Sequence, residues 1–177
     1  MTIKTGFLSG KKLLITGVLS NRSIAYGIAK ACHAQGAELA FSYVGERFKD
    51  RITEFAADFD SKLIFDCDVG SDEQIEKLFT DLTVTWPKFD GFVHAIGYAP
   101  REAIAGDFLD GLSREGFKIA HDISAYSFPA MAKAALPYLN DKSEKSFSIC
   151  SSLPTSQSKI SLESKSAANS VMRSLKR

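Results

Sequence analysis

KLLITGVLSNRSIAYG, residues 12–27, contains the pattern on which the expected architecture rests. Lys12-Leu13-Leu14-Ile15-Thr16 is a short apolar run that ends at Gly17, as is typical of a buried strand in a parallel sheet. From Ser23 to Gln35, apolar residues recur at helical spacing, and Gly36 follows them. The stretch therefore predicts a strand, a glycine turn and a helix, in that order.

The same order of strand and helix recurs along the chain. Strand-like runs occupy residues 39–43, 62–69 and 91–97, and a fifth, shorter one occupies 147–150. Helical patterns occupy 48–59, the segment after Ser71, and 114–139, and Ser71 with Gln74 forms a predicted capping box. Four rounds of strand followed by helix predict an α/β fold, and right-handed crossovers place its helices on both faces of a parallel sheet. This is a three-layer, Rossmann-like parallel sheet with helices on both faces, incomplete at its C-terminal end.

Composition narrows the class of protein. The chain has 177 residues, 45% hydrophobic and 24% charged, which is ordinary for one globular domain. Its net charge of +1 gives no electrostatic reason to expect nucleic acid or an anionic membrane as partner. There is neither an apolar run near the ~20 residues of a membrane span nor a signal-peptide core. A cytoplasmic protein is expected.

Cysteine and histidine usage points away from a metal site. The three cysteines, Cys32, Cys67 and Cys150, have no metal-ligand spacing and are interpreted as reduced packing residues. The three histidines share no such spacing either, and His94 alternates with core residues, so packing is its expected role. No metal is predicted.

The composition changes near Ser143. Residues 146–177 contain eleven serines, one aromatic residue and no glycine. Residues 144–177 carry six Lys or Arg against two Glu, a net charge of +4. We therefore expect a Rossmann domain over residues 1–143 and a divergent, serine-rich basic tail over 144–177. The tail is expected to be weakly folded, with at most one short helix at 164–175.

The turn after the first strand has the features of a phosphate site. Gly17 would let the backbone approach a pyrophosphate, and Ser23 and Ile24 would begin a helix whose N–H groups and dipole face the phosphates. The full Gly-x-Gly-x-x-Gly pattern is not present. From this stretch alone, an ordinary loop between strand and helix is the alternative.

Two further strand ends favour a dinucleotide. Asp68 and Val69 end the third strand, where a carboxylate can accept from an adenine amino group and valine can supply one wall. Ile96 ends the fourth strand, where a nicotinamide ribose would lie. Open α/β sheets bind ligands at such carboxyl ends. No base follows the second strand at Val44-Gly45-Glu46, which favours NADH over NADPH, although Arg47 is nearby.

Residues 6–143 resemble the bacterial enoyl-acyl-carrier-protein reductases of the short-chain dehydrogenase superfamily. The stretches that carry the resemblance are GFLSGK at 6–11, SIAYG at 23–27, WPKFDG at 86–91 and REGFKIAHDIS at 114–124. The resemblance implies tetramers that use NAD(P)H to reduce the trans-2 double bond of acyl chains on acyl carrier protein. It assigns cofactor binding to Gly17, Ser23, Ile24, Asp68, Val69 and Ile96. Val44 is a weaker match to a cofactor contact, and Ala99 matches a position that lines the acyl pocket.

The family's catalytic tyrosine has no counterpart here, so the catalytic residue is unknown. The last tyrosine is Tyr138, before the expected fifth strand. If Lys159 matches the family's lysine, Ser152 occupies the position of the tyrosine. If Lys165 matches that lysine instead, Ser158 or Ser161 occupies the tyrosine position. Tyr98 and Tyr126 are interpreted as fillers or pocket lining, and His121 with Asp122 has no nucleophile partner. A frameshifted, truncated or divergent tail would each produce this ending.

Three functions follow from these observations. The first is NADH-dependent enoyl-acyl-carrier-protein reduction in fatty acid elongation, impaired in this chain. The second is a non-catalytic dinucleotide-binding remnant. The third is an interaction module that uses the helix at 119–136 to pair with a full-length paralogue. NADH affinity without turnover would mark the remnant, and a stable complex with a paralogue would mark the module.

Overall fold

A five-stranded parallel sheet forms the centre of the structure, a computed structural model that describes residues 6–107, 109–140 and 148–149. The strands lie in the order β3-β2-β1-β4-β5, and every neighbouring pair is parallel. Their bounds are β1 Lys12–Ile15, β2 Glu38–Tyr43, β3 Ile64–Asp66, β4 Gly91–His94 and β5 Ser148–Ile149. The predicted parallel sheet is confirmed, including its short fifth strand.

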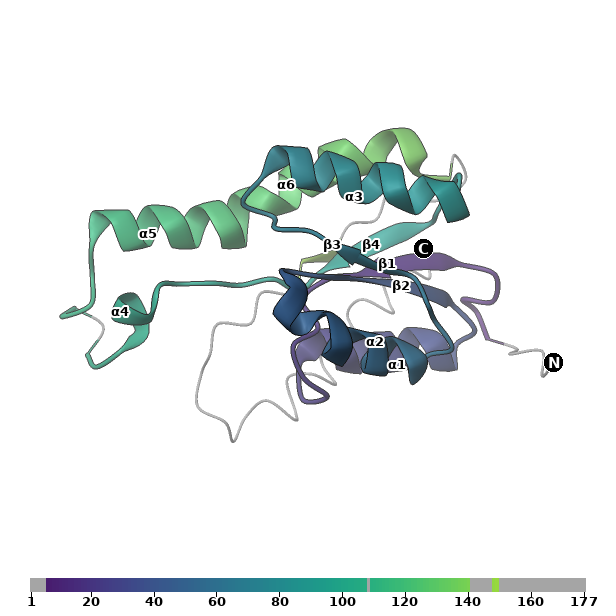
Figure 1. Ribbon diagram of the computed structural model, residues 1–177, viewed down its shortest axis with the longest axis horizontal. Helices are drawn as coiled ribbons and strands as arrows, with labels where there is room; N and C mark the ends of the chain where they lie inside the picture. Colours follow the sequence, from purple (N-terminus) through teal and green to yellow (C-terminus); the bar gives the residue numbers. More distant parts are fainter. Residues whose placement is uncertain (1–5, 108, 141–147, 150–177) are drawn as a thin grey trace.

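Helices cover both faces of the sheet (Figure 1). One face carries α1 (Ile24–Ala34) and α2 (Lys49–Ala57), and the other carries α3 (Asp72–Thr85) and α6 (Ser127–Ala135). Side chains alternate across β1, so Leu13 and Ile15 pack on the first side and Leu14 packs on the second. The predicted three layers are therefore confirmed.

Both cores contain stacked aromatic rings. On the α1–α2 side, Phe41 stacks on Phe59 with ring centroids 5.6 Å apart. On the α3–α6 side, Phe79 stacks on Phe89 at 5.8 Å, and both rings are fully buried. Burial of one such side chain contributes about 1.5–3 kcal/mol. Two separate cores thus fix the sheet between its helices.

Serine side chains cap α1 and α3, and the cap by Ser71 was predicted from the sequence. The hydroxyl oxygens of Ser23 and Ser71 accept hydrogen bonds from the amides of Tyr26 and Gln74. The reciprocal half of the capping box is wrong, because the Gln74 side chain accepts instead from the amide of Asp68 at 2.8 Å. Gln74 therefore ties the start of α3 to the loop after β3.

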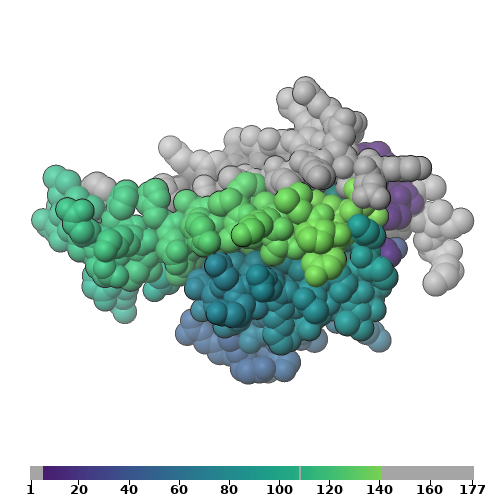
Figure 2. Space-filling view, turned by 90° about the horizontal axis from the view of Figure 1, so that it is seen from above, coloured from purple at the N-terminus to yellow at the C-terminus, as the bar shows by residue number. Residues whose placement is uncertain are grey.

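The helical pattern predicted over 114–139 is confirmed, but a π turn interrupts it. It comprises α5 (Arg114–His121), a π turn (Asp122–Tyr126), α6, and a 3-10 turn (Leu136–Tyr138). The π turn was not expected, and neither was the short α4 (Arg101–Ile104) in the loop that precedes α5. Figures 1 and 2 show α4 and α5 projecting beyond the sheet at one end of the molecule. Large apolar side chains are therefore exposed there, as described below.

The run WPKFDG, residues 86–91, joins three elements at the amino-terminal edge of the sheet. The Asp90 carboxylate accepts from the Lys12 amide and from the Lys11 ammonium, both at 2.9 Å. Burial raises the pKa of Asp90, but these hydrogen bonds and one from Asn140 outweigh it and hold that pKa below its usual value. The Lys88 ammonium donates to the carbonyls of Pro137 and Leu139 at 3.0 and 3.3 Å. The ends of β1, β4 and α6 are thus fastened together.

No helix among the described residues is long and apolar enough to span a bilayer. The proposed tail boundary at 143, the helix at 164–175 and the candidate positions Ser152, Ser158, Lys159, Ser161 and Lys165 lie outside the described residues.

Candidate functional site

The predicted cofactor residues lie along the carboxyl edge of the sheet. Because all the strands are parallel, the residues that follow β1, β2, β3 and β4 lie at one edge. The chain builds β2 and β3 on one side of β1 and then returns to place β4 on the other side. Such a switch point is where open α/β sheets bind ligands. The residues at this edge are Gly17, Ser23, Ile24, Val44, Asp68, Val69 and Ile96.

Gly17 lies against the end of β4. Its φ is +82°, and a Cβ on this residue would lie 2.0 Å from the carbonyl oxygen of Ala95. The preceding residue, Thr16, is fully buried and donates both its amide and its hydroxyl to the carbonyl of Val93. Glycine is therefore required at position 17 by the protein's own backbone, in addition to any ligand that approaches there.

The start of α1 is organised by Ser23. Its amide and its hydroxyl both donate to the Ser20 carbonyl, at 3.0 and 2.7 Å, while its oxygen caps the helix. The expectation that the Ser23 amide faces a phosphate therefore meets a competing partner, Ser20. What remains to favour an anion here is the dipole of the eleven-residue α1, which begins at Ile24.

Asp68 and Val69 form an ordered turn after β3. One carboxylate oxygen of Asp68 accepts from the Gly70 amide at 2.9 Å, and the Asp68 amide donates to the Gln74 side chain. Asp68 is exposed, whereas Val69 is buried. The turn holds the Asp68 carboxylate at the surface beside the buried side chain of Val69.

An acidic side chain from β3 contacts the backbone that follows β2. The amide of Gly45 donates to a carboxylate oxygen of Asp66, the last residue of β3, at 2.8 Å. Val44 is 43% exposed, so its side chain is accessible to a ligand. The Arg47 guanidinium lies 4.6 Å from the centre of the Phe48 ring. The charge in direct contact with the β2 tip is therefore the negative one of Asp66.

The loop after β4 is held by a serine that sequence reasoning missed as a site residue. The hydroxyl of Ser124, in the π turn, accepts from the amide of Tyr98 and donates to its carbonyl, both at 3.0 Å. Ile96 and Ala99 flank Tyr98 and are half-buried. The helical periodicity of the sequence does not predict this contact, because Ser124 lies in the π turn, where the chain departs from regular α-helix.

His94 combines the predicted burial with a polar contact that was not predicted. Its Nε2 lies 2.7 Å from the hydroxyl of Ser127, which is also fully buried and donates to the Ile123 carbonyl at 2.6 Å. Burial lowers the pKa of the His94 imidazole to about 4, against a smaller opposing effect of its own backbone carbonyl. Within the described residues, Nδ1 makes no hydrogen bond. His94 is thus a neutral core residue with one anchored nitrogen.

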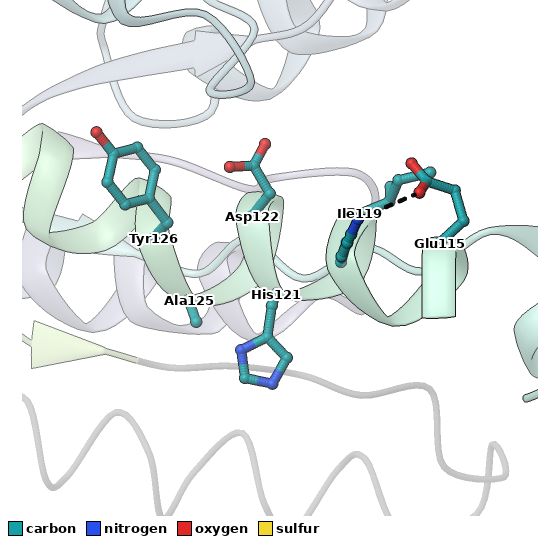
Figure 3. Close-up of a pocket in the computed structure, with 7 residues that line it drawn as sticks. Glu115, Ile119, His121, Asp122, Ala125 and Tyr126 are labelled. Atoms are coloured by element: carbon teal, nitrogen blue, oxygen red, sulfur yellow. Dashed lines mark ion pairs between the residues drawn. The ribbon is translucent and has the colours of Figure 1, made fainter. Parts of the chain in front are cut away.

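An open hollow of about 570 Å³ lies on α5 and the π turn (Figure 3). In Figure 3, Tyr126 and Asp122 point to one side of the helix and His121 points to the other. Tyr126 is about half-exposed and lines this hollow, as expected of a pocket residue, whereas Tyr98, also half-exposed, does not fill the core. The hollow contains none of the predicted cofactor residues; its lining consists of Glu115, Lys118, Ile119, His121, Asp122, Ala125 and Tyr126.

The described cysteines have no reactive environment. Cys32 and Cys67 are free and buried, and burial raises the pKa of each thiol to about 12. Carboxylates at Asp68 and Asp66 add to the rise at Cys67. Both side chains therefore remain protonated and serve as packing. Among residues 6–107 and 109–140, no three or more His, Cys, Asp or Glu side chains are grouped to hold a metal ion.

Comparison with known proteins gives a consistent result at the level of sequence. A family model for enoyl-(acyl carrier protein) reductase matches residues 17–176. The enoyl-[acyl-carrier-protein] reductase [NADH] FabI of Neisseria meningitidis is 59% identical over 137 residues, 77% of this chain and 52% of the relative. The Escherichia coli FabI is 57% identical over 135 residues, 76% of this chain and 52% of its own. The chain thus spans about half the length of the curated relatives it matches.

Solved structures agree. The enoyl-[acyl-carrier-protein] reductase (NADH) of Aquifex aeolicus superposes with a TM-score of 0.75 at 41% identity, covering 95% of this chain and 73% of that one. An Anaplasma phagocytophilum reductase crystallised with NAD gives a TM-score of 0.71 at 37% identity, covering 76% and 51%. Since the family model extends over most of the sequence and the same fold recurs in these structures, the chain belongs to the enoyl-(acyl carrier protein) reductase family.

Proposed function

We propose that this chain is the NADH-binding part of an enoyl-acyl-carrier-protein reductase. The observation that carries the proposal is the meeting of Gly17, α1, Asp68 and Ile96 at one edge of the sheet, on both sides of the β1–β4 switch point. The relatives named as NADH enzymes and the relative crystallised with NAD support this choice of cofactor. Binding of NADH to the purified chain, measured by calorimetry, tests the proposal directly.

Asp68 offers a specific test of the adenine half. Asp68→Asn keeps an oxygen that can accept from the Gly70 amide but replaces the second oxygen with a donor, which cannot accept from an adenine amino group. We expect NADH to bind about 10- to 150-fold more weakly, as for the loss of one hydrogen bond to a charged group, with unchanged thermal stability. Asp81→Asn, an exposed carboxylate on α3, is the matched control. Equal affinities in both variants would place the adenine elsewhere.

Asp66 supports the preference for NADH over NADPH. Its carboxylate lies at the β2 tip, where the extra phosphate of NADPH would meet a negative charge. Asp66→Asn retains an acceptor for the Gly45 amide and removes that charge. The ratio of NADPH to NADH dissociation constants should therefore fall in this variant. A wild-type chain that binds both cofactors equally would contradict the proposal.

For catalysis, we propose that the 177-residue chain by itself has no turnover. Hydride transfer to an acyl β-carbon requires a donor for the negative charge that develops on the thioester oxygen, and loss of one such donor costs about 10²- to 10³-fold in rate. No tyrosine follows Tyr138 in the sequence, and a serine hydroxyl is shorter and less acidic. The assay is loss of NADH absorbance with a crotonyl thioester, against a full-length relative. Turnover within about tenfold of that relative would refute the proposal.

The exposed apolar surface favours a further copy of the chain as partner. Leu109 is 75% exposed, Phe117 58% and Leu112 53%, all in or next to the projecting α5. These three side chains lie within nine residues of sequence, and an exposed apolar patch commonly marks a protein contact. We propose a homo-oligomer, a tetramer by resemblance to the family, and a cytoplasmic setting that keeps the buried thiols reduced. Phe117→Glu should lower the mass seen by light scattering; a wild-type chain that is monomeric at all concentrations would argue against an oligomer.

A further inference from the structure

The loop after β4 is clamped from outside its own strand and helix. Ser124 satisfies both backbone groups of Tyr98 with one hydroxyl, across 26 positions of sequence. Tyr98 lies between the end of β4 at His94 and the start of α4 at Arg101. Because one hydroxyl bonds to both the amide and the carbonyl of Tyr98, it fixes the position and the peptide orientation of this residue together. Loss of either bond would leave one backbone polar group of Tyr98 without that partner.

The π turn that carries Ser124 is itself anchored to β4. The single proton of the Ser127 hydroxyl goes to the Ile123 carbonyl, so this hydroxyl accepts from His94, whose proton is therefore on Nε2. The anchor is fully buried at His94 and Ser127, where water cannot compete for these bonds. Hydrogen bonds therefore connect β4 to the π turn at two points. His94 of β4 bonds to Ser127 directly after the turn, and Ser124 of the turn bonds to Tyr98 in the loop that follows β4.

The proposed cofactor site includes this loop. Ile96 and Ala99 lie on either side of Tyr98, and the expected nicotinamide ribose lies beside Ile96. The adenine half is expected at Asp68 and Val69, which follow β3 at the far side of β2 and β1. A clamp on the β4 loop can therefore act on one half of the ligand only.

We propose that Ser124 is a positioning residue for the nicotinamide half of the cofactor, acting through the backbone of Tyr98. The inference rests on the proposed NADH site. Ordering the loop before the ligand arrives removes an entropic cost from binding, and this saving applies only to ligands that reach the loop. NADH reaches it, whereas ADP, which lacks the nicotinamide ribose, does not.

The test compares two ligands on the full chain. Ser124→Ala should weaken NADH binding about tenfold and leave ADP binding within about twofold, by calorimetry. Ser124→Thr keeps the hydroxyl and should restore NADH affinity. Ser61→Ala is the matched control: its hydroxyl also donates to one backbone carbonyl and accepts one amide, those of Leu39 and Leu63, but at the other edge of the sheet. It should leave both affinities unchanged.

Amide exchange in the ligand-free protein gives an independent readout. Deuterium uptake of the peptide that contains Tyr98 should rise in Ser124→Ala and not in Ser61→Ala. Equal loss of NADH and ADP affinity, no loss of either, or no rescue by threonine would overturn the inference. If the wild-type chain binds neither ADP nor NADH, the proposed function fails and the inference fails with it. Faster exchange at Tyr98 would in that case still establish the clamp as a feature of the fold.

Discussion

Replacing Gly17 with alanine should destabilise the protein through its own backbone, before any cofactor is considered. The φ of +82° costs an L-residue about 1–2 kcal/mol. The new Cβ would lie 2.0 Å from the Ala95 carbonyl oxygen, so β1 and β4 would have to separate by roughly 1 Å or more at that point to reach ordinary contact distance. Overpacking of this kind costs about 1–3 kcal/mol. We expect a total loss of about 2–5 kcal/mol in the free energy of unfolding.

The measurement is urea unfolding followed by fluorescence of Trp86, the single tryptophan, which is 4% exposed. Gly10→Ala is the control, because Gly10 also has a positive φ, +76°, but a Cβ added there would meet no atom within 4 Å. It should lose only the conformational cost of about 1–2 kcal/mol. Equal losses in the two variants would show that the contact with Ala95 has no energetic weight. A Gly17→Ala loss of NADH affinity, taken alone, would therefore not locate a pyrophosphate.

Three other outcomes are expected. The His94 pKa of about 4 lies below its ordinary 6.5, so the unfolded chain takes up the proton first as the pH falls. The free energy of unfolding should therefore fall by about 3 kcal/mol between pH 6.5 and 4. Urea titrations at each pH measure this dependence, which His94→Gln should abolish. Asp90→Asn should cost about 1–3 kcal/mol at pH 7. Because the native pKa of Asp90 lies below 3.8, the unfolded chain takes up the proton first as the pH falls below 3.8, and the difference between the two proteins should shrink there. A difference that stays constant with pH would contradict the charged state of Asp90. Finally, the exposed apolar surface around Phe117 predicts a chain that is marginally stable and prone to associate. A monomer with a sharp, high-temperature calorimetric transition would contradict this prediction.

The regular elements were predictable because each carries a local signal. Runs of Leu, Ile, Phe and Val predicted β1, β2 and β4, and apolar spacing predicted α1, α2 and α3. β3 is only three residues long, Ile64–Asp66, inside the eight-residue run at 62–69 that predicted it. The parallel arrangement of the strands also followed, since strands joined by helical crossovers leave few alternatives.

The contacts that organise the candidate site were not predictable, because they join distant positions. The Gly17 contact with Ala95 spans 78 residues, and the Ser124 contact with Tyr98 spans 26. The π turn inserts its register change in a segment that has helical periodicity on both sides. For His94, alternation with core residues correctly indicated burial but carried no information about Ser127.

The central position of β1 has a consequence for synthesis of the chain. β1 ends at residue 15, but its neighbour β4 begins only at residue 91, 76 residues later. At about 5–20 residues per second, a ribosome needs about 4–15 s to cover that distance. During that interval, β1 can pair with β2 while its other edge, with Leu13, Leu14 and Ile15, has no strand to pair with. The nascent protein therefore presents an apolar strand edge to whatever surrounds the ribosome until WPKFDG and β4 emerge.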